Sequence, residues 1–330
     1  MTIVIRVAGD ARVGFGHVRR MWTLAETLRQ RGAAVHIVAA SADAGTVLAR
    51  AGFSVTAERS PGATAETRRV AVGASVLVVD DPTAPTVPDA AVPVVAFDDT
   101  GESDQSVALV VNGSVGAEAL AYPSAVSRLL GPRFIVLRPA FAEPVARRAA
   151  ATIERVIVLG GGGHAPGLVS VIAHAAAALP RAMVDVVVGP FGAAPRVPAA
   201  LASRVRVCVD PPDIRALMLA ADVAVSGGGQ TAYELAATAT PTLGVRLADN
   251  QRLNLTGLAA AGCLEDVGAP DDPTFAARVT ERLRSLDAAP ATRQALGDAG
   301  RRAVDGQGAA RVADSILTLA GRAPAMADAR

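Results

Sequence analysis

A series of short, continuously apolar runs, rich in valine and isoleucine, constrains the fold of this chain most. Apolar residues at every position, rather than at alternate ones, are typical of strands buried on both faces in a parallel sheet. Helical patterns separate the runs, which form two groups of five and predict an α/β protein of two Rossmann-like, doubly wound domains facing across a cleft. The first group is Ile3–Val7, Val35–Ala39, Val76–Val79, Val94–Phe97 and Ala108–Val111, and the second is Val156–Leu159, Met183–Val188, Val205–Val209, Val223–Val225 and Thr242–Val245.

The boundary between the domains is expected between Val111 and Val156, where proline and bulky side chains interrupt the rhythm of strands and helices. We predict an N-terminal domain over residues 1–140 and a C-terminal domain over residues 141–308. Residues 309–330 are expected to form a helix and tail, and this helix could cross back to the first domain.

Composition argues against several classes of function. The net charge is +1 and every basic residue is arginine, so neither a clustered basic surface nor a lysine nucleophile is indicated. No run reaches the roughly 18 apolar residues of a membrane span, and the N-terminus shows no signal-peptide pattern. We therefore expect a cytoplasmic protein that binds neither nucleic acid nor a membrane, with Cys208 and Cys263 as free thiols.

Glycine-rich turns follow three of the predicted strands and precede helical patterns, at Gly14–Gly16, Gly160–Gly163 and Gly227–Gly229. Backbone N–H groups at such turns can bind an anion, and ligands of open α/β sheets lie beyond the carboxyl ends of the strands. The first turn has Arg19 where the G-x-G-x-x-G fingerprint requires glycine, and the chain contains no P-loop motif. The turns therefore predict a phosphate-containing ligand and disfavour a nicotinamide or flavin dehydrogenase and a P-loop ATPase.

The first turn also carries the candidate catalytic residue. His17 begins the helical pattern after Gly14 and Gly16, and histidine is the side chain best suited to moving a proton near neutral pH. We predict that His17 is a general base and that the two glycines let a sugar pass close to the backbone. Arg12 could meet a carboxylated sugar such as a uronic acid, or it could be solvated.

The turns of the second domain suit a nucleotide. Gly228 and Gly229 would let a diphosphate approach a helix N-terminus, whose dipole stabilises negative charge. Glu234 lies about one turn further along and could accept both ribose hydroxyls, or could simply complement the helix dipole. The expected nucleotide-binding residues are Ser226, Gly228, Gly229, Gln230, Thr231 and Glu234, together with Gly161, Gly162, Gly163 and His164.

Carboxylate and amide side chains follow the last strand of the second group. Asp249, Asn250 and Gln251 open another helical pattern at this strand end, and their side chains suit sugar hydroxyls. Asp249 or Asn250 could instead cap the helix. We predict that these three residues bind the substrate.

Two acidic pairs, Asp80-Asp81 and Asp98-Asp99, lie at strand ends of the first domain. They could hydrogen-bond a substrate or bind Mg²⁺, and the alternative is capping and loop bracing; we predict that Asp80 and Asp81 bind the substrate. The histidines and cysteines show no metal-ligand spacing, and no G-x-S-x-G motif indicates a serine hydrolase. We expect no metal site.

Taken in order, these segments resemble the nucleotide-sugar hydrolase of pseudaminic acid biosynthesis, a family similar in fold to GT-B glycosyltransferases. The resemblance implies a GT-B-like fold, no required cofactor, a nucleotide bound mainly by the C-terminal domain, and His17 activating water at the anomeric carbon. It also implies substrate contacts from Arg20 and Arg138. The matching segments are Arg6, Gly14–Arg20, Phe97–Asp99, Val111-Asn112, Gly131–Phe141, Gly161-Gly162, Ser226–Ala236 and Ala248–Gln251.

The chain departs from this family at two places. In the family, the strand that corresponds to the one ending near Val79 is usually followed by an acid and, two residues later, by a tyrosine, whereas the run here is Asp80-Asp81-Pro82 with no tyrosine. The turn Gly161–His164 lacks the hydroxyl and carboxylate that usually follow its glycine pair. Both departures fall where the sugar and phosphate are expected.

We therefore predict an enzyme that hydrolyses a UDP-activated sugar at the anomeric carbon, with His17 as the general base and UDP as the leaving group. The alternative is a GT-B glycosyltransferase that moves the sugar, such as a uronic acid or amino sugar, to a small acceptor hydroxyl or heterocyclic nitrogen. A third hypothesis is a non-catalytic nucleotide-sugar binder. The expected partners are a nucleotide-sugar and either water or a small-molecule acceptor.

Overall fold

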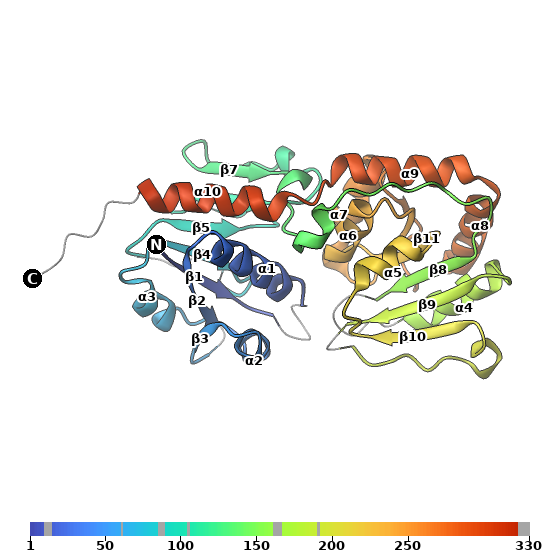
Figure 1. The fold of residues 1–330 in the computed structure, drawn as a ribbon, viewed down its shortest axis with the longest axis horizontal. Helices are drawn as coiled ribbons and strands as arrows, with labels where there is room; N and C mark the ends of the chain where they lie inside the picture. Colours follow the sequence, from blue (N-terminus) through green and yellow to red (C-terminus); the bar gives the residue numbers. More distant parts are fainter. Residues whose placement is uncertain are drawn as a thin grey trace, which may run out of the picture. The chain divides into compact units, whose positions relative to one another are not determined.

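The computed structural model describes residues 1–9, 15–60, 62–84, 90–103, 106–160, 167–189 and 192–322. The chain divides into two compact units (Figure 1). Unit 1 contains Met1–Pro139 and the segment that begins at Gln307, and unit 2 contains Ala140–Gly306. The expected boundary between residues 140 and 141 lies next to this division.

Unit 1 is built on a seven-stranded, wholly parallel sheet with the order β3-β2-β1-β4-β5-β6-β7. Its first six strands have the order of a Rossmann fold. Every residue of β4 is buried, which means that both faces of the sheet centre are covered. The strands are β1 (Thr2–Val7), β2 (Ala34–Ala39), β3 (Ser54–Ala57), β4 (Val76–Asp80), β5 (Val94–Phe97), β6 (Leu109–Asn112) and β7 (Ser127–Leu130).

Helices bury apolar stripes against this sheet and against each other. The helix α1 (Gly16–Gln30) buries Val18, Met21, Leu24 and Leu28, which share one helical face. The C-terminal helix α10 (Gly308–Arg322) packs against α1 within unit 1. The remaining helices of this unit are α2 (Ala42–Arg50) and α3 (Ala65–Ala71), with short 3₁₀ turns η1 (Ala117–Ala119) and η2 (Pro132–Phe134).

Unit 2 repeats the architecture with six parallel strands in the order β10-β9-β8-β11-β12-β13. The strands are β8 (Arg155–Leu159), β9 (Met183–Val188), β10 (Val205–Val209), β11 (Val223–Gly227), β12 (Thr242–Val245) and β13 (Glu265–Asp266). The helices are α4 (Leu168–Ala178), α5 (Ile214–Ala220), α6 (Gln230–Ala237), α7 (Arg252–Ala260), α8 (Phe275–Ala288) and α9 (Pro290–Ala303). The 3₁₀ turns of this unit are η4 (Ala199–Leu201) and η5 (Asp249–Gln251). Another 3₁₀ turn, η3 (Pro139–Ala142), lies at the division between the two units.

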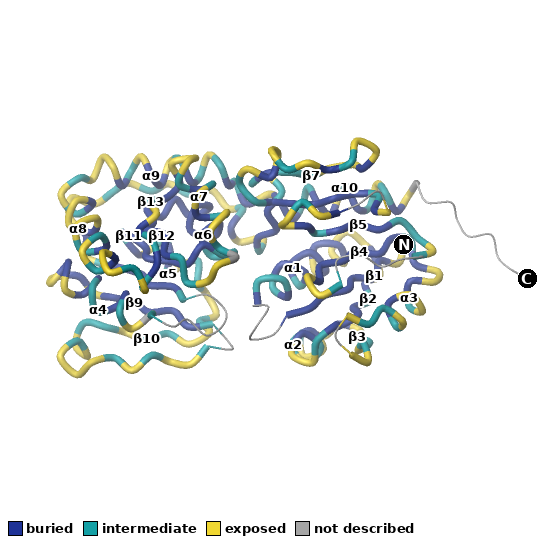
Figure 2. The backbone as a smooth tube through the Cα atoms, turned by 180° about the vertical axis from the view of Figure 1, so that it is seen from behind, coloured by how far each residue is buried: buried dark blue, intermediate teal, exposed yellow. Residues whose placement is uncertain are grey.

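Small residues allow the helices of unit 2 to approach each other closely. A Cβ at Gly297 of α9 would collide with the carbonyl oxygen of Ala239, just after α6, and one at Gly300 would lie 3.0 Å from the Cα of Ala236. Although the chain has few aromatic side chains to fill its interior, these helices pack closely because small residues let their backbones touch. In both units the inner strands of the sheet are buried while the outer helix faces are exposed (Figure 2).

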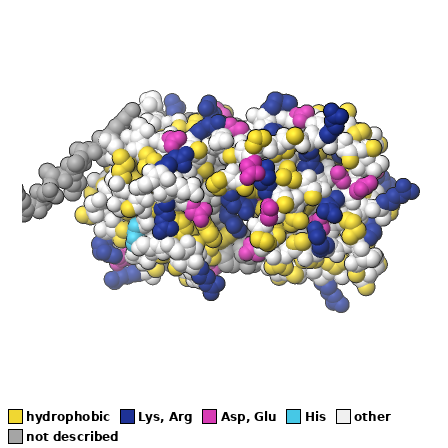
Figure 3. Space-filling view, in the orientation of Figure 1, with side chains coloured by type: hydrophobic (Ala, Val, Ile, Leu, Met, Phe, Trp, Pro, Cys, Tyr) yellow, Lys and Arg dark blue, Asp and Glu magenta, His cyan; other side chains and the backbone are white. Residues whose placement is uncertain are grey.

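The predicted α/β fold of two Rossmann-like units is confirmed, and all ten predicted strands are present. Three strands that the apolar runs did not predict, β3, β7 and β13, complete the sheets. On the face shown in Figure 3, arginine and acidic side chains are interspersed. Within the described part of the chain, no helix is long and apolar enough to cross a membrane.

Candidate active site

The candidate site residues cluster where the strand order of each sheet reverses. In unit 1 this switch point lies between β1 and β4, and in unit 2 between β8 and β11 (Figure 1). Doubly wound sheets bind ligands outside the carboxyl ends of the strands at such points. His17 follows β1, Asp80 ends β4, and Gly227–Gly229 ends β11 and leads into α6.

His17 and Asp80 form a close pair in unit 1. The first turn of α1 carries the imidazole, whose Nδ1 lies 2.7 Å from Oδ1 of Asp80. The side chain of His17 is 21% exposed and that of Asp80 is 1% exposed, so the imidazole can be reached from solvent while the carboxylate cannot. Because an ionised carboxylate only accepts hydrogen bonds, Nδ1 is the donor in this contact, and in the neutral imidazole the lone pair is then on Nε2. No described residue occupies Nε2, which can therefore take a proton from a ligand.

Arg20 keeps Asp80 ionised. Nε of Arg20 donates to Oδ2 of Asp80 and Nη2 donates to Oδ1, each at 2.6 Å. Burial alone would raise the pKa of Asp80, but the charge of Arg20, together with His17, holds that pKa well below its usual value. Nη2 also lies 3.1 Å from Nδ1 of His17; since both nitrogens are donors, this contact reflects their shared acceptor, Oδ1 of Asp80.

Asp99 and Phe97 fix Arg20 from the other side. Nη1 of Arg20 donates to both carboxylate oxygens of Asp99, at 3.1 and 2.9 Å, and the guanidinium lies 5.3 Å from the ring centre of Phe97. Asp80 and Arg20, which we expected to contact substrate, are thus buried and committed to each other. We propose that these two residues hold His17.

A second buried network lies beside this one, around Arg6 of β1. Arg6 donates to Oδ2 of Asp81 through Nε and Nη2, and to Glu58 and Thr67 through Nη1. The other oxygen of Asp81 accepts from the backbone and the hydroxyl of Thr83. Since the side chain of Asp81 is fully buried and both of its oxygens accept hydrogen bonds, we propose that it braces the loop, the alternative given above to binding substrate.

In unit 2, the two glycines at the start of α6 have different reasons to be glycine. A Cβ at Gly228 would collide with Leu255 of α7, so this position is set by packing. A Cβ at Gly229 would meet nothing within 4 Å, so the backbone just before α6 opens to free space. A ligand can therefore approach at Gly229, where the helix N-terminus favours negative charge.

The side chains around this turn are partly buried. Ser226 is buried and its hydroxyl donates to the carbonyl oxygen of Gly227; its expected contact with a nucleotide stays a prediction. Gln230 and Thr231 lie half-buried in the first turn of α6. Glu234 lies one turn further and is only 6% exposed.

Gln251 contacts the turn rather than open space. Its Oε1 accepts from the backbone N–H of Gly228 at 3.2 Å and from that of Leu247 at 3.1 Å. The expected contact of Gln251 with a sugar stays a prediction, which its Nε2 donors could still make. Asp249 is exposed in η5, and Arg138 is half-buried after β7 in unit 1.

Several expected site residues cannot be compared with the structure. Gly16 begins α1 and is half-buried, next to His17. The predictions for Arg12, Gly14, Gly161, Gly162, Gly163, His164 and the side chain of Asn250 lie outside the described residues.

Sequence reasoning identified Asp80 but missed its partnership with His17. In the Rossmann strand order the first and fourth strands are neighbours, so residues that follow them lie side by side. Applying this order to the predicted strands that end at Val7 and Val79 would have placed His17 and Asp80 next to each other.

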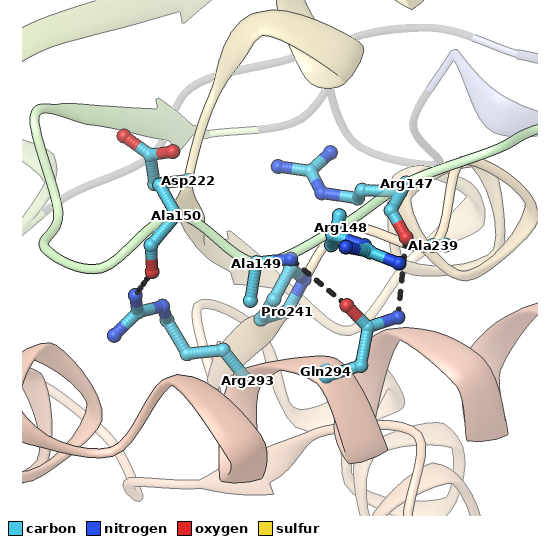
Figure 4. Close-up of a pocket in the computed structure, with 9 residues that line it drawn as sticks. All are labelled: Arg147, Arg148, Ala149, Ala150, Asp222, Ala239, Pro241, Arg293 and Gln294. Carbon is cyan, nitrogen blue, oxygen red and sulfur yellow. Dashed lines mark hydrogen bonds between the residues drawn. The ribbon is translucent and has the colours of Figure 1, made fainter.

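No cluster of three or more histidine, cysteine, aspartate or glutamate side chains in the described ranges could hold a metal ion. A small cavity of about 10 Å³ in unit 2 is lined by α9 and by the extended segment from Arg147 to Ala150 (Figure 4). Arg293 donates to the carbonyl oxygen of Ala150, while Gln294 bonds the backbone of Ala149 and Arg147. This cavity has room for about one water, and its polar contacts fasten the segment to the helix.

Comparisons with known proteins show the fold class. No protein-family model and no curated protein sequence matches the chain. Solved structures match along nearly its whole length. MurG from Acinetobacter baumannii has a TM-score of 0.64 at 16% identity, over 96% of this chain and 100% of that one. The calicheamicin glycosyltransferase CalG4 has a TM-score of 0.64 at 14% identity (98% and 99% covered), and the glycosyltransferase VinC in complex with dTDP has 0.63 at 15% (98% and 100%).

The chain therefore has the GT-B fold of nucleotide-sugar glycosyltransferases. None of the comparisons supports the resemblance to the hydrolase of pseudaminic acid biosynthesis.

Proposed function

We propose that this protein is a glycosyltransferase that moves a sugar from a nucleoside diphosphate to a small acceptor, with His17 as the general base. The observation that carries the proposal is the His17–Asp80 pair at the switch point of unit 1. A buried, ionised carboxylate fixes the imidazole tautomer that leaves Nε2 able to accept a proton. The proposal is supported by the whole-length similarity to CalG4 and VinC, both named as glycosyltransferases.

In the proposed reaction, the acceptor's hydroxyl or ring N–H donates its proton to Nε2 of His17 as the acceptor atom attacks the anomeric carbon. The bond between that carbon and the diphosphate oxygen breaks, and the nucleoside diphosphate leaves with the electron pair. The imidazolium that forms is stabilised by Asp80, to which Nδ1 already donates. Arg20, which also donates to Asp99, holds Asp80 in place.

The donor nucleotide is proposed to bind unit 2. Its diphosphate would lie at the open backbone of Gly229 and the first turn of α6, and Glu234 would accept the ribose hydroxyls. The nucleoside diphosphate is UDP or dTDP; VinC is in complex with dTDP. Thr231 and Gln230, in the same helical turn, are proposed as further contacts.

Hydrolysis of the nucleotide-sugar is the second candidate. Its specific support is the sequence resemblance of Gly14–Arg20 and Ala248–Gln251 to the hydrolase of pseudaminic acid biosynthesis. His17 would then deprotonate water in place of an acceptor, with the same bonds formed and broken. The structural similarity to named glycosyltransferases favours transfer over hydrolysis.

Replacing Glu234 with glutamine tests the nucleotide site. We expect the wild type to bind UDP or dTDP, and the variant to bind about tenfold or more weakly, because hydrogen bonds to a charged group contribute about 1.5–3 kcal/mol. Isothermal titration calorimetry measures both affinities. Glu154→Gln, at an exposed glutamate just before β8 of the same unit, is the matched control and should bind as the wild type does.

Equal affinity of Glu234→Gln and the wild type would refute the ribose contact. A wild-type protein that binds neither UDP nor dTDP would refute the proposed function itself.

A further inference from the structure

We propose that Asp99 is a positioning residue that supplies the negative charge which lets His17 accept a proton. It acts through Arg20 and Asp80, which lie between it and the imidazole. The inference rests on the proposed function, since it concerns the base of that reaction. Its contacts form a row in which His17 donates to Asp80, and Arg20 donates to Asp80 and to Asp99.

The charges of this row do not cancel. Burial alone would lower the pKa of Arg20, but the carboxylates of Asp80 and Asp99 raise that pKa above its usual value, so the guanidinium stays charged. One positive charge therefore lies between two carboxylates, and with a neutral imidazole the row has a net charge of about −1. When His17 takes a proton, the net charge of the row becomes zero.

Without Asp99, the charge of Arg20 would cancel that of Asp80. Arg20 donates to both oxygens of Asp80 at 2.6 Å, and its Nη2 lies 3.1 Å from Nδ1 of His17. A proton on His17 would then leave a net positive charge beside side chains that are only 1% and 10% exposed, those of Asp80 and Arg20. Because an uncompensated charge is costly to remove from water, the imidazole would accept a proton less readily.

The loop that carries Asp99 is held by contacts of its own. Asp98 accepts from the backbone and hydroxyl of Thr100 through Oδ1, each at 2.8 Å, and from the backbone N–H of Ser103 through Oδ2 at 2.7 Å. The hydroxyl of Tyr122 donates to the carbonyl oxygen of Asp98 at 3.1 Å. These bonds fix the backbone next to Asp99, so its charge lies at a defined place beside Arg20.

The other charged side chains beside this row make different contacts. Asp81, the next residue after β4, pairs with Arg6 of β1. The guanidinium of Arg19 lies 5.2 and 6.0 Å from the centres of two aromatic rings. Within the described part of unit 1, Asp99 is therefore the acid that offsets the charge of Arg20 in addition to Asp80.

The experiment compares Asp99→Asn with the wild type, because asparagine keeps an oxygen that can accept from Arg20 and removes only the charge. The pH profile of kcat/KM for sugar transfer reports the ionisation of the base in the free enzyme. Removing a negative charge makes the base harder to protonate, so the acid limb of the profile should move to lower pH. We expect a shift of about half a pH unit, since the side chain of Asp99 is 39% exposed and its charge is partly screened.

Asp314→Asn is the matched control. Asp314 also accepts from an arginine of unit 1, Arg31, at 2.8 Å, but Arg31 lies at the opposite end of α1 from His17. Its acid limb should coincide with that of the wild type. A lower kcat/KM in Asp99→Asn with an unmoved acid limb would mean that Asp99 acts through geometry alone and would overturn the inference. An equal shift in both variants would overturn it as well.

NMR titration of the histidine rings provides a test that needs no substrate. The chain has four histidines, and the ring signal that disappears in His17→Ala belongs to His17. In Asp99→Asn this signal should titrate about half a pH unit lower than in the wild type, and an unchanged midpoint would contradict the inference. If the wild type turns over no nucleotide-sugar, the proposed function fails, but this titration still decides whether the charge of Asp99 acts on His17.

Discussion

Replacement of His17 with alanine should lower the rate of sugar transfer by about 10²- to 10⁴-fold, the range that a positioned general base contributes. Binding of UDP or dTDP should persist, since the proposed nucleotide contacts belong to unit 2 and His17 belongs to unit 1. Release of the nucleoside diphosphate measures the rate, and calorimetry measures the binding. A variant that keeps wild-type turnover would remove His17 from the mechanism.

Two further variants define what the histidine needs. Asp80→Asn keeps the size of the side chain but removes the negative charge that holds Nδ1–H, so its kcat should also fall while KM changes little. His36→Ala is the matched control. His36 lies on β2 and bonds the hydroxyls of Ser54 and Thr56, away from the switch point, so its loss should not change kcat.

Replacement of Arg6 with methionine should destabilise unit 1 by about 3–5 kcal/mol, the usual cost of breaking a buried ion pair from one side. The side chains of Glu58 and Asp81 are fully buried on Arg6 and would each lose their cation. Urea unfolding followed by fluorescence measures the change, because the single tryptophan, Trp22, lies in α1 of this unit.

An exposed arginine provides the comparison. Arg69 pairs with Glu66 but its side chain is 66% exposed, so Arg69→Met should cost no more than about 1 kcal/mol. Adding Glu58→Gln and Asp81→Asn to Arg6→Met should recover part of the loss, since no buried carboxylate then lacks a counterion. If the Arg6 and Arg69 variants lose similar stability, the Arg6 network does not have the role assigned to it.

The interior of both sheets and one edge strand, β10, could be predicted from the sequence, while the other three edge strands could not. Strands such as β4 and β8 are almost entirely buried and therefore appear as unbroken apolar runs. The edge strands β3 and β7 are short and partly exposed, and β13 has only two residues, Glu265 and Asp266. Such strands are held by backbone pairing with a neighbour, and their side chains carry no burial signal.

The site was predictable in part. The chemistry of His17 and its place after the first strand were sufficient to select it as the candidate base. The contacts of Asp80, Asp81 and Gln251 were not predictable, because each side chain bonds a residue that is distant in sequence and adjacent only in the folded sheet. Carboxylate and amide groups at strand ends suit a ligand and a neighbouring loop equally well, so residue type alone could not decide between them.

Release of the nucleoside diphosphate is expected to depend on an acceptor. The most direct measurement follows UDP or dTDP release from a panel of nucleotide-sugars, with and without small alcohols, phenols and nitrogen heterocycles, and identifies the sugar product by mass spectrometry. We expect release only when an acceptor is present, in equal amount to a new glycoside, and its loss in His17→Ala. Release at the full rate without an acceptor, with free sugar as the product, would contradict transfer and establish hydrolysis instead.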